Sequence, residues 1–181
     1  MEVEINKILP KMLASFAKIF IGVKEVGGNN RGEFVSMFQK AVDGKAQGEA
    51  WCAAFSSFCI KNTSKLMEDS VGDESFDFNP KIELSESTCN LWFKNSTTQR
   101  LNAPEVGCLM IWRHWKNGIP TWQGHIGIVV NIIDSNIVQT VEGNTSSDGP
   151  NDRDGDGVFL KNRAINRNYG TLKLLGFLKV Y

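Results

Sequence analysis

The first half of the chain carries its apolar residues at the spacing of amphipathic helices. Apolar positions recur every three or four residues over about 9–20, 33–42 and 50–62, and glycine-containing segments separate these runs. The spacing predicts three helices, each with one apolar face. A short fourth helix is expected at about Ser87–Asn95. The acidic stretch at 68–85 that precedes it has no period and predicts a surface loop.

The second half has the pattern of β-strands. Runs rich in Ile, Val, Leu and Trp are separated by turn residues, and they occupy 108–113, 125–133, 137–142, 157–163 and 172–180. These runs predict a meander of antiparallel strands. Helices followed by strands indicate the α+β class, with N-terminal helices packed on a C-terminal antiparallel sheet. No repeat, linker or low-complexity segment divides the sequence, so we expect a single domain over residues 1–181.

Composition narrows the class of protein further. Of the 181 residues, 41% are hydrophobic and 22% are charged, which is the balance of a folded protein and not that of a disordered chain, a collagen or a coiled coil. The 20 basic residues balance the 20 acidic ones, so no net field attracts nucleic acid or an anionic membrane. We therefore expect no nucleic-acid partner and no membrane insertion. We also expect a monomer.

The start of the sequence lacks the pattern of a secretion signal. Residues Met1 to Lys7 include two glutamates where a signal is basic, and Lys11 and Lys18 interrupt the apolar stretch that follows. We expect neither a signal peptide nor a membrane span. The protein would then be made in the cytoplasm, and any action outside it would require release or delivery by another route.

Cys52 is the candidate nucleophile. It stands in the first turn of the third predicted helix, where the helix dipole and the unpaired amide groups favour a thiolate. The alternative is a buried structural cysteine that shares a helix face with Cys59. The four cysteines, at 52, 59, 89 and 108, form no Cys-x-x-Cys pair and no short Cys/His spacing, so we expect no metal site, no cofactor and no disulfide framework.

A cysteine nucleophile needs an imidazole to accept its proton, and the chain contains two histidines. His125 is the preferred base, because glycines at 124 and 127 leave room beside it for a substrate or another backbone. His114 is the alternative base, and it lies just ahead of a predicted turn. If Cys52 were absent, His125 would be interpreted as a residue that only caps a strand.

Glu142 and Asn144 are candidates for the third catalytic group, which fixes the tautomer of the imidazole. If four residues connect the two strands, Ile132 lies opposite Ile137 and both polar side chains lie on the face of His125. A connection of three residues would turn Glu142 to the other face unless a bulge intervened. The alternative interpretation of this segment is a plain turn.

Three short segments follow one another along the chain: WCAAF at 51–55, GHIGIV at 124–129 and EGNTS at 142–146. Together they resemble the CHAP family of cysteine, histidine-dependent amidohydrolases and peptidases, in the single-domain form found in phages and bacteria. The resemblance implies a papain-like fold and hydrolysis of an amide bond in peptidoglycan. It also implies that Cys52 is the nucleophile, that His125 is the base, and that Glu142 and Asn144 orient or polarise it.

The resemblance leaves the bond and the rival functions open. Family members cut either the muramoyl-alanine amide or a peptide bond within the stem or cross-bridge, and the motifs do not choose between them. An NlpC-type or toxin-like thiol hydrolase of papain fold would share the chemistry and differ in substrate. A non-catalytic wall-binding homologue would keep the fold without turnover.

Two tryptophans and one acidic loop are further candidates for binding. Trp51, beside the nucleophile, and Trp122, just ahead of His125, could line a groove for a glycan or a stem peptide. Residues 152–157 copy the opening of a calcium loop, but its twelfth position is Arg163 where a bidentate glutamate is needed. We therefore interpret this loop as an acidic turn that leads into a strand.

Overall fold

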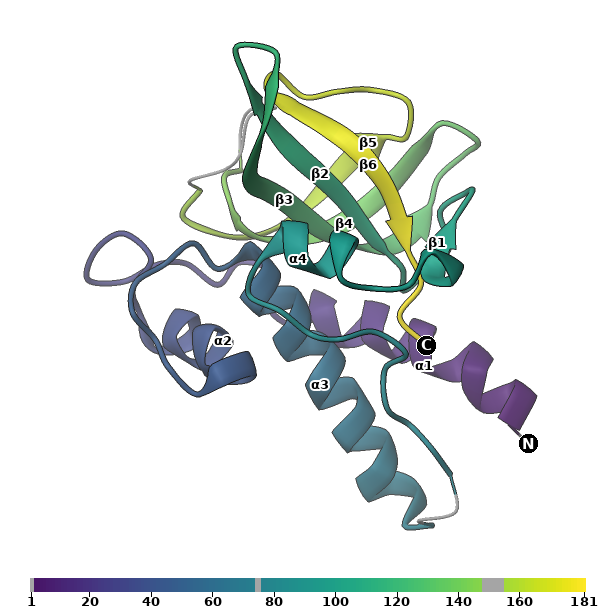
Figure 1. The fold of residues 1–181 in the computed structure, drawn as a ribbon. Coiled ribbons are helices and arrows are strands. Elements are labelled where there is room, and N and C mark those ends of the chain that lie inside the picture. Colours follow the sequence, from purple (N-terminus) through teal and green to yellow (C-terminus); the bar gives the residue numbers. More distant parts are fainter. Residues whose placement is uncertain (1, 74–75, 148–154) are drawn as a thin grey trace.

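A computed structural model of the chain describes residues 2–73, 76–147 and 155–181. Its helices are α1 (Glu2–Lys18), α2 (Glu33–Asp43), α3 (Cys52–Val71) and α4 (Thr88–Phe93), followed by a 3-10 turn, η1 (Thr97–Gln99). Its strands are β1 (Arg100–Leu101), β2 (Leu109–Lys116), β3 (Ile119–Ile132), β4 (Ile137–Thr145), β5 (Gly157–Ala164) and β6 (Leu172–Leu178). Figure 1 shows the helices against one side of a curled sheet, which confirms the predicted α+β class.

Helix α3 is longer than its apolar pattern predicted. It continues to Val71, through residues that we expected to begin a surface loop. A Lys65–Asp69 ion pair of 3.1 Å spans one turn there, and Gly72 takes the left-handed conformation that closes the helix. The C-terminal half of α3 extends away from the sheet, and its N-terminal end lies against it (Figure 1). Within the described residues, no helix has the length and apolarity that a bilayer span requires.

The strands form one sheet in the order β1-β6-β2-β3-β4-β5, and every neighbouring pair is antiparallel. Strands β2 to β5 follow one another as the predicted meander. Strand β6 departs from that prediction, because it pairs with the free edge of β2 instead of continuing beyond β5. The two-residue strand β1, which the sequence pattern did not indicate, covers the outer edge of β6.

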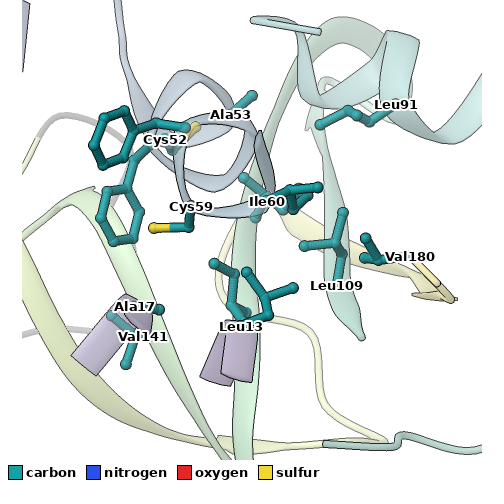
Figure 2. Close-up of a cluster of buried hydrophobic side chains, with 14 of the residues drawn as sticks. Leu13, Ala17, Cys52, Ala53, Cys59, Ile60, Leu91, Leu109, Val141 and Val180 are labelled. Carbon is teal, nitrogen blue, oxygen red and sulfur yellow. The ribbon is translucent and has the colours of Figure 1, made fainter. Parts of the chain in front are cut away.

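The sheet has an apolar cluster on each of its two faces. The larger cluster lies between the sheet and the helices, and Figure 2 shows Leu13 of α1, Ile60 of α3 and Leu109 of β2 within it. The smaller cluster lies on the other face, inside the curl of the sheet, and contains Trp112 and Tyr169. Because alternate residues of a strand face opposite sides, β3 sends Ile126 and Ile128 to the helices and His125 to the inner face.

The connection from β3 to β4 differs from the predicted one by one residue. Ile132 pairs with Val138 instead of Ile137, and this shift alone would turn Glu142 away from the inner face. A bulge between Val129 and Asn131 takes up the extra residue, so the pairing nearer the site returns to the predicted register. The bulge therefore offsets the one-residue shift at the turn and keeps Glu142 on the face of His125.

Candidate active site

Cys52 is the first residue of α3 and lies at the end of the helix that meets the sheet. Its side chain is almost fully buried, and its sulfur lies 3.7 Å from Oγ1 of Thr88. The amide groups of the first turn have no partners within their own helix, so their dipoles favour a negative charge at this position. The backbone amide of Ala53 acts in this way, because its hydrogen bond to Cys52 lowers the pKa of the thiol.

His125 lies on β3 with its ring 1% exposed and stacked on Trp112. Its Nε2 atom lies 2.8 Å from Oε2 of Glu142. Its other nitrogen, Nδ1, is buried and has no hydrogen-bond partner within the described part of the chain. A carboxylate can only accept, so Nε2 carries the proton and Nδ1 is left to exchange one with the Cys52 thiol.

Glu142 is completely buried and is held by three further hydrogen bonds. The hydroxyl of Thr140 donates to Oε1 over 2.5 Å, and Arg163 donates through Nε to Oε1 over 2.7 Å and through Nη2 to Oε2 over 2.5 Å. Gly127 allows the carboxylate to enter, because a Cβ atom at that position would lie 2.7 Å from Cγ of Glu142. The carboxylate that faces His125 therefore has a fixed position and a fixed charge.

Arg163 balances this buried charge from β5. Its guanidinium is 3% exposed and lies over two aromatic rings, 5.4 Å from the centre of Trp112 and 4.7 Å from that of Tyr169. Aromatic faces attract a cation, and the bidentate contact satisfies Glu142, so an ion pair can persist here out of water. In the sequence, Arg163 is recognisable only as a departure from a calcium loop, and its contact with Glu142 was not predicted.

The charges at the site favour a thiolate and an imidazolium. Burial alone would raise the pKa of Cys52, but His125 and Thr88 outweigh it and hold that pKa below its ordinary value of 9.0. Burial would likewise lower the pKa of His125, and the interactions with Cys52 and Glu142 raise it instead to about 9. Despite its burial, Glu142 has a pKa well below its usual range, because Arg163 and His125 favour its charged form.

The remaining three cysteines have the opposite electrostatics. Burial raises the pKa of Cys59 far above its ordinary value, raises that of Cys108 to about 12, and also raises that of Cys89. All four cysteines are free thiols. Cys52 is therefore the one cysteine in the chain whose surroundings favour the reactive form.

Asn144 does not reach His125, although we expected it on the same strand face as Glu142. A bulge in β4 between Glu142 and Thr145 puts Asn144 at a φ of 54°, which rotates its side chain out of the strand's alternation. Its Oδ1 atom accepts a hydrogen bond of 3.1 Å from the backbone N–H of Trp51, directly ahead of the nucleophile. Asn144 thus fixes the start of α3, and the nitrogen Nε2 of His125 is bound by Glu142.

An open cleft of about 240 Å³ leads to Cys52, and its walls include Thr88, Glu49, Glu86 and Trp122. The side chain of Trp122 is 77% exposed, so it is free to contact a ligand.

Trp51, the other expected binding residue, does not line this cleft. Its side chain is completely buried, stacks on Phe38 and donates from Nε1 to Glu25. The expectation was wrong: it rested on the position of Trp51 next to Cys52 in the sequence. At the N-cap of α3, the side chain of Trp51 turns into the core instead.

The two remaining candidates are the second histidine and the acidic loop. His114 lies on β2 with Nδ1 3.5 Å from Oγ1 of Thr121, and it is His125 that interacts with Cys52. The first half of the calcium-like loop, residues 152–154, lies outside the described residues. Of its later residues, Asp156 pairs with Lys24 over 2.8 Å. The described residues contain no cluster of His, Cys, Asp or Glu that could hold a metal ion.

Comparison with known proteins gave one match. A family model of the CHAP domain matches residues 44–144, a segment that contains Cys52, Thr88, His125, Glu142 and Asn144. Neither the curated proteins nor the solved structures gave a match. Arg163 lies beyond the matched segment, although it contacts Glu142 inside it.

Proposed function

The chain belongs to the CHAP family, whose hydrolases are typically cysteine-dependent amidases or peptidases acting on peptidoglycan, and from this we propose that it cleaves an amide bond of the bacterial cell wall with Cys52 as nucleophile. The observation that carries the proposal is the lowered pKa of Cys52 beside a buried His125–Glu142 pair, at the base of an open cleft. A structural cysteine in an apolar core has the opposite shift, as Cys59 does.

In the first half of the reaction, the Cys52 thiolate attacks the carbonyl carbon of the substrate amide. A carbon–sulfur bond forms, and the carbonyl electron pair moves onto oxygen. When the tetrahedral intermediate collapses, the carbon–nitrogen bond breaks and the His125 imidazolium gives its Nδ1 proton to the leaving amine. The acyl group remains on sulfur as a thioester.

In the second half, neutral His125 takes a proton from a water molecule that attacks the thioester. Collapse of the second tetrahedral intermediate breaks the carbon–sulfur bond and releases the acid, which restores the thiolate and the imidazolium. The backbone N–H of Cys52, unpaired within its helix, is suited to bind the oxyanion in both steps. Glu142 keeps Nε2 protonated and stabilises the imidazolium form.

The cleft supports a polymer of sugars and peptides as substrate. Trp122 presents most of its ring to solvent at the cleft wall, and an exposed indole provides a flat apolar surface on which a sugar ring or an apolar part of a stem peptide can pack. The cell wall is therefore the proposed site of action.

Incubation with purified peptidoglycan, followed by mass spectrometry of the soluble fragments, tests the function. New amino termini on intact stem peptides would identify a muramoyl-alanine amidase, and shortened stems would identify an endopeptidase. Cys52→Ser should release no fragments, because a serine hydroxyl is not ionised by this histidine at neutral pH. Cys59→Ser is the matched control and should retain hydrolysis. If the wild-type protein binds the wall and releases nothing, the proposed hydrolysis is wrong and a binding module remains.

A further inference from the structure

Thr88 lies against the sulfur of Cys52 and belongs to none of the sequence motifs discussed above. It is the first residue of α4, is 5% exposed and lines the cleft. Its Oγ1 atom is 3.7 Å from Sγ of Cys52, within hydrogen-bonding range for sulfur. The hydroxyl therefore touches the atom that reacts in the proposed function.

The packing around Thr88 fixes the direction of this hydroxyl. A Cβ atom at Gly124 would lie 3.0 Å from Cγ2 and 3.3 Å from Cβ of Thr88, so the methyl side of Thr88 packs closely on the backbone of β3. Helix α4 is also attached to β3, because the thiol of Cys89 donates to the carbonyl of Gln123 over 3.6 Å. A β-branched side chain packed on one side has little rotamer freedom, so Oγ1 stays directed at the sulfur.

The direction of the hydrogen bond follows from the charges at the site. In the proposed function His125 takes the thiol proton, and a thiolate has no proton to donate. We propose that Thr88 is a further catalytic residue, whose hydroxyl donates a hydrogen bond to the Cys52 thiolate and so keeps the nucleophile ionised at more acidic pH. The inference rests on the proposed function for its consequence, but the contact itself can be tested without a substrate.

Other titratable groups surround the sulfur and act differently. His125 on β3 stabilises the thiolate while its ring is protonated, and Cys89 on α4 is a neutral thiol at neutral pH. Glu49, ahead of α3, and Glu86, ahead of α4, line the same cleft and oppose a negative charge on sulfur. Thr88 is uncharged, so its hydroxyl can donate to the sulfur at any pH at which Cys52 is ionised.

Alkylation of Cys52 by iodoacetamide, followed across pH by mass spectrometry, tests the contact. Thr88→Val replaces the hydroxyl by a methyl group of similar size and keeps the packing on Gly124. Loss of one donor to the thiolate should raise the pKa of Cys52 by about one unit, which lowers the alkylation rate about tenfold on the acid side and leaves the alkaline plateau within about twofold. Thr97→Val, at an exposed position, is the matched control and should follow the wild-type curve.

Thr88→Ser separates the hydroxyl from the methyl group. It should lie between the wild type and Thr88→Val, because its hydroxyl can still donate from a freer rotamer. Coincident curves for the wild type and Thr88→Val, or equal shifts for Val and Ser, would overturn the proposal. If Thr88→Val does not fold, as judged by circular dichroism, the comparison of Thr88→Ala with Thr88→Ser replaces it.

The same variants distinguish this proposal from the proposed function. If the alkylation curve of Thr88→Val shifts but neither the wild type nor any variant releases wall fragments, Thr88 stabilises the thiolate and the hydrolase function fails. If the wild type releases fragments and the curve of Thr88→Val does not move, the hydrolase stands and the role of Thr88 fails. If both stand, the acid limb of wall hydrolysis should shift together with the alkylation curve.

Discussion

Replacing Glu142 by glutamine tests the electrostatic basis of the site. Glutamine keeps the size of the side chain and removes its charge, so His125 loses the carboxylate at its Nε2 atom. Arg163, whose side chain is 3% exposed, loses its bidentate contact with that carboxylate in the same step. Two effects are therefore expected, one on the pKa of His125 and one on the stability of the fold.

The size of the first effect follows from the pKa of His125. That pKa is about 9 against an ordinary value of 6.5, so the folded protein favours the imidazolium by about 2.5 units, or roughly 3 kcal/mol. Cys52 and Glu142 both contribute to this preference. Glu142→Gln should therefore lower the pKa of His125 from about 9 towards its ordinary value of 6.5. The alkaline limb of the rate profile should then move down by the same amount, because His125 must be protonated to supply the leaving amine with its proton.

The second effect is a loss of stability. Removing one partner of a buried ion pair costs about 3–5 kcal/mol, so Glu142→Gln should unfold at a clearly lower urea concentration. Combining it with Arg163→Met removes the other charge of the pair, so the double variant should regain part of this loss. The pKa of His125 in the double variant should lie between those of the single variant and the wild type, because no cation then opposes the imidazolium.

Stability and pH are linked in a defined direction. The pKa of His125 is higher in the folded state than in the unfolded one, so its stabilisation is complete below pH 6.5 and is lost as the pH rises through about 9. The wild type should lose stability over this interval, and Glu142→Gln should lose less of it.

The assays are nitrogen NMR titration of the imidazole, urea unfolding at several pH values, and wall hydrolysis as a function of pH. Glu49→Gln is the matched control, because that carboxylate lines the same cleft and the structure pairs His125 with Glu142 instead. An unchanged imidazole pKa in Glu142→Gln would refute the assignment of Glu142 as the partner of His125. A double variant no more stable than the single one would refute the account of Arg163.

Three other predictions concern single residues of the site. Iodoacetamide at neutral pH should label Cys52 before Cys59, because burial raises the pKa of the Cys59 thiol. Peptide mapping would show the order, and earlier labelling of Cys59 would contradict the assigned pKa directions. Asn144→Ala should lower the free energy of unfolding by about 1–3 kcal/mol and lower the rate at every pH, because it removes the hydrogen bond to Trp51 and leaves an alanine at positive φ. Asn144→Gly tolerates the positive φ, so it should regain only the part of the stability that strain costs. A full recovery of stability would mean that the hydrogen bond to Trp51 is unimportant. Trp122→Ala should raise KM several-fold and leave kcat and stability unchanged. The control Ile119→Ala, at an exposed position of the same hairpin, should change none of these quantities. A fall in kcat alone for Trp122→Ala would argue against a binding role.

Local patterns predicted most elements because their apolar side chains enter one of the two cores. The helical period of the first half marks the faces that pack on the sheet, and the apolar runs of the second half mark strands that are covered on both faces. The pairing of His125 with Glu142 could also be anticipated, because strand alternation puts both on the inner face once the register is known. The sequence did not reveal that a bulge at Val129–Asn131 would be needed to produce that register.

The residues that were missed depend on contacts far apart in sequence. Arg163 is 21 residues from Glu142 in the sequence. The two charges compensate each other only when β4 and β5 are paired, so neither residue could be predicted as buried from its own neighbours in sequence. Thr88 is 36 residues from Cys52 and reaches it because α4 packs on β3. The hydrophobic pattern along the chain contains no information about such pairings. For Asn144, the alternation rule itself failed, because a bulge and a positive φ interrupt the strand.

The position of β6 has a consequence for the order in which the protein is made. Leu178 pairs with Leu109, and the difference, 178 − 109 = 69 residues, is the length of chain that must be synthesised between the two partners. A nascent chain that has reached Thr145 already contains Cys52, His125 and Glu142, but Arg163 and the strand that covers the edge of β2 have not yet been synthesised. Pairing over so long a separation is slow compared with helix formation. We therefore expect the reactive thiolate to appear only after the ribosome has released β5 and β6, so that a stalled or truncated translation product carries every motif of the family and no activity.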